Sequence, residues 1–235
     1  MTKSKFIVFS YRNEPDLPTL QLGTGDISST DQIKFLGVTI DKNLNFKPHI
    51  NTVLNKMSKS VGVMYRLNQF LPSQTLISIY YALVYPYLGY GVESWYSVTK
   101  TMSEKVRILQ KKSIRSIFKI PYNGSTRTYF KEFNILQLPE VYKFKICSMF
   151  AKYIKDDASS NDYISNYLQL NSDIHRYNTR IRDNFSVPYF RRSASQSCFI
   201  YQSINNWNSL PDVVKQKKNQ ANFNRILRKY LVSHY

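Results

Sequence analysis

Hydrophobic and polar positions follow two different periods along this 235-residue chain, and the first is a period of two. Between residues 33 and 40 the large apolar residues mostly alternate, which predicts a strand, and Gly37 predicts a bulge or a close backbone approach. Short apolar runs at residues 6–10 and 20–22 predict two more strands, with a polar hairpin connection over residues 23–31. These segments predict a small antiparallel sheet of about three strands.

After Pro48 the apolar residues recur every three or four positions, which predicts amphipathic helices. We predict helices over about residues 48–69, 73–90 and 103–120, the last with Ser103 as its N-cap. The apolar side of the first helix is formed by Ile50, Val53, Leu54, Met57, Val61, Met64 and Leu67. Three antiparallel helices with short connections form a bundle.

The second half of the chain is predicted to be helical as well. Short or medium helices are expected near residues 128–133, from Pro139 onward, and over 195–207 and 220–232, with a loop at 156–161. The predicted fold class is α+β, mostly α, with a small N-terminal sheet followed by a helical bundle and further C-terminal helices. The expected divisions are residues 1–46, 47–122 and 123–235.

Charge indicates the class of partner. The chain has 33 Lys and Arg against 15 Asp and Glu, a net charge of +18, which favours a polyanion. Nucleic acid ranks ahead of an anionic membrane surface, although composition alone does not separate the two. Residues 67–92 carry no charge, but polar residues and prolines interrupt them, so we expect a kinked buried helix and no membrane span.

Two groups of basic residues are candidate nucleic-acid contacts. Basic residues project from the predicted helices opposite their apolar faces, and Lys111, Arg115 and Lys119 form a ladder at four-residue spacing. The helical candidates are Lys56, Lys59, Arg66, Lys111, Lys112, Arg115 and Lys119. They form either a solvated helix face or a surface that follows a phosphate backbone.

The second group lies in a loop over residues 174–192, where arginines alternate with aromatic residues. The candidates there are Arg176, Tyr177, Arg180, Arg182, Arg191 and Arg192. Such a mixture suits stacking on unpaired bases and contact with phosphates. An equally open interpretation is a loop that its tyrosines anchor on the bundle.

The residues show no complete catalytic constellation, so no catalytic residue and no metal ligand is predicted. Cys147 and Cys198 with the three histidines lack zinc-ligand spacing, and phosphate-binding glycine motifs are absent. Asp156-Asp157 is the only adjacent acidic pair, and its context predicts a solvated helix end. The two isolated cysteines favour a reducing, intracellular compartment such as the cytoplasm or nucleus.

Several ordered motifs together resemble those of non-LTR, LINE-type, jockey-like retrotransposon reverse transcriptases. The N-terminal motifs are Lys3-Ser4-Lys5-Phe6-Ile7-Val8-Phe9 and Ile33-Lys34-Phe35-Leu36-Gly37-Val38-Thr39-Ile40-Asp41, with Leu44, Phe46 and His49-Ile50. The later motifs are Tyr85-Pro86-Tyr87-Leu88, Gly91 with Trp95, Leu109-Gln110-Lys111-Lys112 with Arg115, Tyr177-Asn178-Thr179-Arg180 and Trp207-Asn208-Ser209-Leu210-Pro211. The resemblance extends over essentially the whole chain, from the end of the palm through the thumb to the C-terminal region.

This resemblance implies specific roles. Lys3 would lie near the phosphates of the incoming nucleotide, residues 47–120 would form a thumb, and a hairpin would correspond to the primer grip. The residues of that hairpin are Phe35, Leu36, Gly37 and Val38. The metal-binding aspartates of such polymerases would lie before Met1, so Mg²⁺ is expected only in the full-length polymerase and no cofactor is expected for this chain.

The expected function is therefore a fragment of an RNA-directed DNA polymerase that binds template–primer RNA and DNA without catalysis. The alternatives are a stand-alone or host-repurposed RNA- or DNA-binding protein and a protein of anionic membrane surfaces. Further expected partners are the remaining polymerase and endonuclease parts.

Overall fold

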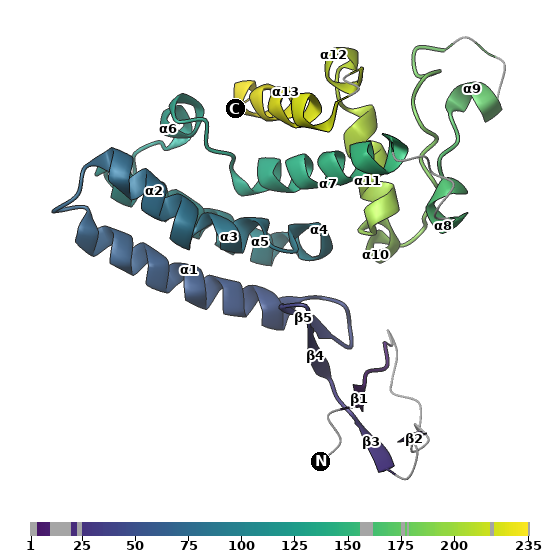
Figure 1. Ribbon diagram of the computed structural model, residues 1–235, viewed down its shortest axis with the longest axis horizontal. Coiled ribbons are helices and arrows are strands. Elements are labelled where there is room, and N and C mark those ends of the chain that lie inside the picture. The colour runs from purple at the N-terminus through teal and green to yellow at the C-terminus, as the bar shows by residue number, and fades with distance from the viewer. Residues whose placement is uncertain are drawn as a thin grey trace.

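The computed structural model describes residues 4–9, 20–22, 25–155, 162–174, 177, 179–216 and 219–234. Helices form most of it, and the strands lie at the N-terminal end, on one side of the helices (Figure 1). The predicted fold class, α+β and mostly α, is confirmed. The expected divisions at residues 46 and 122 stay predictions.

The helices follow the predicted amphipathic segments closely. Those of the first half are α1 (Lys47–Leu67), α2 (Ser73–Leu83), α3 (Tyr85–Gly89), α4 (Val92–Trp95) and α5 (Lys100–Phe118). Those of the second half are α6 (Arg127–Glu132), α7 (Leu138–Lys155), α8 (Asp162–Ser165), α9 (Asn171–Ile174), α10 (Ser193–Gln196), α11 (Phe199–Asn208), α12 (Asp212–Lys215) and α13 (Gln220–Ser233). The apolar side predicted for α1 is buried at Ile50, Val53, Met57 and Met64 and partly buried at Leu54, Val61 and Leu67.

Three helix predictions were wrong in their boundaries. The segment predicted as one helix over residues 195–207 is interrupted at Ser197 and Cys198, between α10 and α11. The segment predicted as one helix over residues 73–90 is split at Val84, because Pro86 has no amide proton to donate to the preceding turn. The third helix begins at Lys100, with Thr99 as its N-cap, so Ser103 lies inside it. The Ser103 hydroxyl is buried and donates to the carbonyl of Tyr96 at 2.9 Å.

The N-terminal strands form a three-stranded sheet in the order β1-β3-β2, from β1 (Lys5–Phe6), β2 (Leu20–Leu22) and β3 (Gly25–Ser29). The pair β1 and β3 is parallel and the pair β2 and β3 is antiparallel. The prediction of an all-antiparallel sheet with a loop over residues 23–31 was therefore wrong. The composition of β3, Gly-Asp-Ile-Ser-Ser, has low strand propensity, and its pairing with strands on both sides overrides that propensity.

A second, two-stranded sheet joins the first to the helices. Its strands are β4 (Gln32–Phe35) and β5 (Val38–Asp41), which form an antiparallel hairpin with Leu36 and Gly37 as the turn. Both turn residues have positive φ, 45° and 84°, as a tight two-residue hairpin requires. The alternation over residues 33–40 therefore belongs to two strands and not to one bulged strand, since a two-residue turn preserves the period.

This hairpin packs closely against the junction of α3 and α4. The Tyr90 hydroxyl donates to the Leu36 carbonyl, and a Cβ atom at Gly37 would lie 3.1 Å from the Tyr90 ring. Gly91 has φ of 59°, and a Cβ atom there would lie 2.9 Å from Cγ2 of Val38. The close approach predicted for Gly37 is confirmed, and Gly91 makes a second one.

The base of the hairpin is fixed by two polar side chains. The buried Asp41 carboxylate accepts the amides of Asn43 and Phe46, the latter at 2.7 Å, and so shapes the turn before α1. The Thr39 amide donates to Nδ1 of His49 at 3.4 Å. Burial, and secondarily the charge of Lys56, lower the pKa of His49, so the imidazole stays neutral and can accept.

The helices pack around one hydrophobic core, which contains residues from before and from after residue 122 in the sequence. A buried amide lies within it. Nε2 of Gln110 donates to the Tyr80 hydroxyl at 2.9 Å and to the Leu136 carbonyl at 2.8 Å, and its Oε1 accepts the Leu138 amide at 2.9 Å. Gln110 thus connects α2, α5 and the start of α7. No helix of the described residues is long and apolar enough to cross a membrane.

We expect Gln110→Leu to lower the free energy of unfolding by about 3 kcal/mol, because it leaves a buried carbonyl and a buried amide without their partner. Gln74→Leu, at an exposed position of α2, is the matched control and should change it by less than about 0.5 kcal/mol. Urea denaturation followed by circular dichroism measures both, and equal stabilities would contradict the role given to Gln110.

Gly91→Ala should destabilise the protein by about 1–3 kcal/mol, because the added methyl group meets Val38 and the positive φ disfavours alanine. Gly62→Ala in α1 is the control, since its Cβ atom would have no neighbour within 4 Å. That change should stabilise α1 by roughly 0.5–1 kcal/mol. Relative to the unaltered chain, the urea midpoint should decrease for Gly91→Ala and increase for Gly62→Ala.

His49 should make stability depend on pH. The pKa of His49 is lower in the folded protein than the unfolded value of about 6.5. The contribution of the neutral imidazole to the free energy of unfolding is therefore fully present above about pH 6.5 and decreases as the pH falls below that value. The urea midpoint of the unaltered chain should therefore fall on acidification from neutral pH. In His49→Asn, which lacks a titrating group, the fall should be smaller, and parallel curves would show that His49 is not responsible.

Candidate nucleic-acid interface

A groove of about 1100 Å³ lies between the second halves of α1 and α5. Its walls come from α1, from α5 and from the segment that follows α5. The lining residues are Ser58, Val61, Gly62, Tyr65, Arg66, Asn68, Gln69, Leu109, Lys112, Arg115, Ser116, Lys119, Ile120, Pro121 and Tyr122. The two helices run in the same direction, and the groove lies toward their C-terminal ends.

Side-chain hydrogen bonds hold the helices in this parallel arrangement. Near their beginnings, the Thr99 hydroxyl donates to the Asn45 carbonyl at 3.0 Å. Near their ends, Nδ2 of Asn68, which directly follows α1, donates to the Ser116 carbonyl at 3.1 Å. The Ser73 hydroxyl, at the start of α2, donates to the Ile117 carbonyl at 3.3 Å and so joins α2 to the end of α5. These last two bonds also satisfy carbonyls that the end of α5 leaves without an intrahelical partner.

The groove is positively charged along its length. The groove lining includes Arg66 of α1, Lys112 and Arg115 of α5, and Lys119 directly after α5, and it includes no Asp or Glu. The chain therefore brings together four of the seven basic residues predicted on the helices. Part of this accumulation also stabilises the fold, because cations near helix C-termini interact favourably with the helix dipole.

Two tyrosines that the sequence did not single out stand at the groove. Tyr65 and Tyr122 are 66% and 82% exposed, and each lies next to basic residues of the lining. Tyr65 directly precedes Arg66 in the sequence, and that adjacency was the available signal. Tyr122 becomes part of the groove only because the chain turns sharply at Lys119, whose φ of 52° ends α5.

The predicted ladder of Lys111, Arg115 and Lys119 is not one continuous exposed row. Arg115 also makes contacts within the protein. Its Nη2 donates to the Gly124 carbonyl at 3.3 Å, and its guanidinium lies 6.0 Å from the centroid of the Tyr122 ring. Lys119 lies past the end of α5. Lys111 does not line the groove, and its pKa is lowered by partial burial and then by the neighbouring Arg107.

The remaining helical candidates lie outside the groove. The Lys56 ammonium lies 5.6 Å from the centroid of the Tyr87 ring, on the side of α1 that meets α3. Lys59 is exposed and precedes Arg66 by seven residues, which places it two turns away on the same side of α1. It therefore extends the charged surface of Arg66 toward the hairpin.

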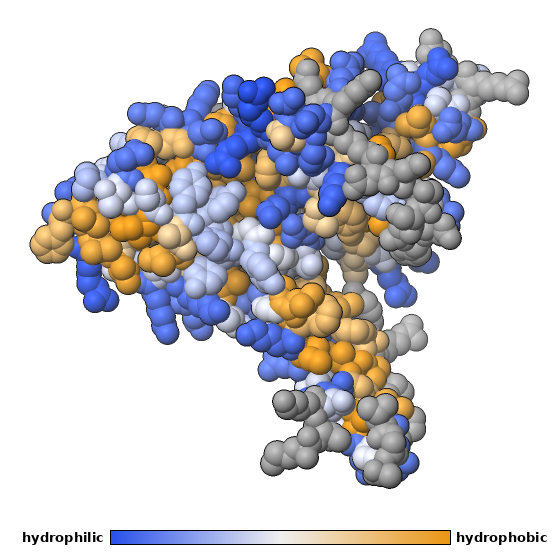
Figure 2. Space-filling view, in the orientation of Figure 1, coloured by the Kyte–Doolittle hydropathy of each residue, from blue (hydrophilic) through white to orange (hydrophobic). Residues whose placement is uncertain are grey.

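The hairpin candidates divide into two exposed residues and two that pack against the helices. Phe35 and Leu36 are exposed at the tip, where hydrophobic surface covers β4 and β5 (Figure 2). Gly37 and Val38 contact the α3–α4 junction instead, through Tyr90 and Gly91. Lys3 lies outside the described residues.

The described part of the loop over residues 174–192, named here the basic-aromatic loop, lies at the opposite end of the molecule from the groove, beside α8, α9 and α10 (Figure 1). Tyr177, Arg180, Arg182, Arg191 and Arg192 are all exposed. Arg176 lies outside the described residues. The interpretation in which the tyrosines of the loop anchor it was wrong for Tyr189, whose side chain is 89% exposed.

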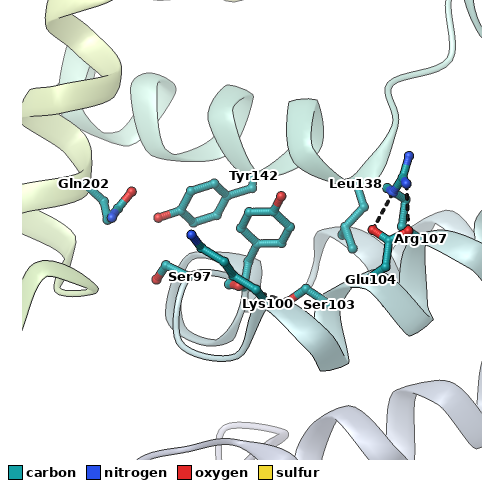
Figure 3. Close-up of a pocket in the computed structure, with 9 residues that line it drawn as sticks. Ser97, Lys100, Ser103, Glu104, Arg107, Leu138, Tyr142 and Gln202 are labelled. Carbon is teal, nitrogen blue, oxygen red and sulfur yellow. Dashed lines mark hydrogen bonds and ion pairs between the residues drawn. The ribbon is translucent and has the colours of Figure 1, made fainter. Parts of the chain in front are cut away.

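A second pocket, of about 320 Å³, lies where α4, α5, α7 and α11 meet (Figure 3). Its one acidic side chain, Glu104, is bound at both oxygens by Arg107, at 2.6 and 2.7 Å. Burial raises the pKa of Tyr142 to about 12, although the nearby Ser97 hydroxyl acts in the opposite direction. This pocket pairs no nucleophile with a base.

A metal site does not emerge from the described residues either, since no three of their His, Cys, Asp or Glu side chains come together. Asp156 and Asp157 lie outside them. The thiol of Cys147 is buried, which raises its pKa to about 12, and both cysteines are free. Within the described part of the chain there is therefore no site that fits the two metal ions of a polymerase.

Comparison with known proteins gives one consistent result. The chain is 29% identical over 118 residues to the RNA-directed DNA polymerase from mobile element jockey of Drosophila funebris, which covers 48% of this chain and 13% of that protein. It is 28% identical over 127 residues to the jockey polymerase of Drosophila melanogaster, covering 52% and 13%. It is 26% identical over 117 residues to the probable RNA-directed DNA polymerase from transposon BS of Drosophila melanogaster, covering 48% and 13%.

No family model and no solved structure matches the chain. The aligned segment spans 13% of the length of each of these three relatives. Over about half of its own length, this chain is therefore similar to part of the RNA-directed DNA polymerases of jockey-type non-LTR retrotransposons.

Proposed function

We propose that this chain is the thumb-like, template–primer-binding part of a retrotransposon reverse transcriptase, and that it binds a nucleic-acid duplex in the groove between α1 and α5. The observation that supports this most directly is the groove itself, which gathers Arg66, Lys112, Arg115 and Lys119 without an acidic residue. A row of cations flanked by aromatic rings matches the regular phosphates of a duplex.

The parallel course of α1 and α5 supports a contact with the phosphate backbone. Arg66 and Lys112 approach from different helices, so two cations can contact phosphates on both sides of the groove. Contacts of this kind position a duplex without reading its sequence. We therefore propose shape- and charge-dependent binding, with weak sequence preference.

The hairpin is proposed to contact the primer strand. Phe35 and Leu36 project from its tip, and Tyr90 and Gly91 fix its orientation relative to the helices. Lys3 is proposed as the contact to nucleotide phosphates by resemblance alone. Residues 1–46, 47–122 and 123–235 are proposed as palm remnant, thumb-like bundle and C-terminal region.

Catalysis is not proposed for this chain. Polymerisation needs clustered carboxylates that hold two Mg²⁺ ions, and we assign those carboxylates and the ions to another part of the polymerase. The partners proposed are RNA and DNA inside the cell, together with the remaining polymerase and endonuclease parts. The purified chain should bind a primer–template and incorporate no nucleotide with Mg²⁺ present.

The triple variant Arg66→Ala, Lys112→Ala, Lys119→Ala tests the groove. Each cation that contacts a phosphate contributes about 0.7–0.9 to the slope of log affinity against log salt, so this slope should fall by about two to three. Fluorescence anisotropy with an RNA–DNA hybrid at several salt concentrations measures it. Arg115 is left unchanged, because its guanidinium also donates to the Gly124 carbonyl and its loss would disturb the fold.

A control variant removes the same charge elsewhere. Lys143 and Lys152 of α7 and Lys229 of α13 are exposed, lie outside the groove and can be changed to alanine together. This control should keep the slope within about half a unit of that of the unaltered chain. If both triple variants lose slope equally, binding follows net charge and the groove is not the site; if neither binds differently from the unaltered chain, the groove cations form an ordinary solvated face.

A further inference from the structure

The basic-aromatic loop presents exposed arginines and an exposed tyrosine on a backbone that hydrogen bonds hold in place, and duplex binding in the groove does not account for these residues. Between Thr179 and Arg192 the sequence holds four arginines against one acid, Asp183. All four arginines are exposed, and so is Tyr189, at 89%. A tyrosine ring that is almost entirely in water contributes little to the stability of the fold, so its position calls for another explanation.

The backbone of this loop is fixed by hydrogen bonds at several points. Asn208 of α11 binds the main chain of Phe185 twice, with its Oδ1 accepting the amide at 3.1 Å and its Nδ2 donating to the carbonyl at 2.8 Å. The Ser172 amide donates to the Arg182 carbonyl at 3.0 Å. Nε2 of Gln196 donates to the Phe190 carbonyl at 2.8 Å.

Two phenylalanines attach the loop to the helices. The Phe185 ring packs edge-on against Phe150 of α7, with centroids 5.6 Å apart. The Phe190 ring lies 6.0 Å from that of Tyr201 in α11. Phe190 is half-buried beside Tyr201, whereas the neighbouring Tyr189 is 89% exposed.

The loop is thus a fixed framework that presents a ring and four guanidinium groups to solvent. We propose that residues 179–192 bind an unpaired RNA or DNA strand, with Tyr189 stacking on a base and the four arginines contacting phosphates. The choice of an unpaired strand follows from the ring, since the bases of a duplex already stack on each other and offer no free face. This inference rests on the proposed function and adds a second site to it.

The spacing of the arginines suits several nucleotides. Arg182 and Arg191 are nine residues apart, so the chain between them can span at most about 30 Å. Single-stranded sites of about 4–16 nucleotides are common for such surfaces. The groove lies at the other end of the molecule (Figure 1), so one nucleic acid with a duplex and an unpaired tail can contact both surfaces.

Asn208 acts as a positioning residue in this proposal. It sets where the loop lies, because it satisfies both backbone groups of Phe185, and the contacts to phosphate are left to the arginines. Lys215 supports the same arrangement, since its Nζ donates to Oδ1 of Asn184 at 3.3 Å and to the Asn208 carbonyl at 3.4 Å. This explains a structural need for asparagine in the Trp207-Asn208-Ser209-Leu210-Pro211 motif.

The test uses the full chain and two probes, an unstructured oligouridine of about 12 nucleotides and a blunt RNA–DNA duplex. Tyr189→Ala should weaken oligouridine binding about tenfold and leave duplex binding unchanged, whereas Tyr189→Phe should retain it because the ring remains. Phe70→Ala, which removes another highly exposed ring at the α1–α2 connection, is the control and should change neither affinity.

Asn208→Ala should lower oligouridine affinity several-fold with duplex affinity retained, which a general loss of structure would not do. Changing the four arginines to glutamine should reduce the salt slope for oligouridine by about two to three, while the Lys143, Lys152 and Lys229 control does not. An oligodeoxythymidine probe of the same length shows whether the strand must be RNA.

The proposal is overturned if Tyr189→Ala and the four-arginine variant bind oligouridine as tightly as the unaltered chain. If instead the Arg66, Lys112 and Lys119 variant loses oligouridine binding, the single-stranded site lies in the groove. A different result would contradict only the duplex-binding proposal. In that case the unaltered chain does not bind the duplex probe, while its binding of oligouridine still depends on Tyr189.

Discussion

The arrangement of this protein depends on one buried amide. Gln110 is inaccessible to solvent and bonds at once to Tyr80, to the Leu136 carbonyl and to the Leu138 amide. A buried polar group is stable only when its hydrogen bonds are made, so this side chain fixes α5 relative to α2 and α7. The other side of α5 is consequently directed toward α1, and that is where the groove forms.

The groove shows how structural and functional demands coincide in the same residues. Cations at the ends of α1 and α5 compensate the dipoles of two parallel helices, and the same cations line a groove that contains no acidic residue. Arg115 illustrates the overlap, because it supports the turn at Gly124 while its charge remains in the groove. Lys112 and Lys119 line the same groove without supporting that turn, so they are better placed to contact a ligand.

Aromatic residues of this chain fall into two groups, those buried in the core and those exposed to solvent. Trp95, Phe150 and Phe223 fill the core, and Phe185 extends that core under the basic-aromatic loop. Tyr65, Tyr122 and Tyr189 stay in solvent next to cations. Their hydroxyl groups tolerate water, so tyrosine is suited to an exposed stacking position where phenylalanine is suited to an anchor.

The sequence by itself determined the helical periods, the apolar side of α1, the close approach at Gly37 and the excess of positive charge. It also contained motifs that resemble those of jockey-type polymerases. It did not determine which basic residues meet, because helical periodicity fixes the side of a residue on its own helix and not the neighbour of that side. The tertiary structure alone brought Arg66 to Lys112, removed Lys111 and Lys56 from that group, and paired β3 between two strands against its own propensity. These outcomes depend on contacts between distant segments, which local sequence does not encode.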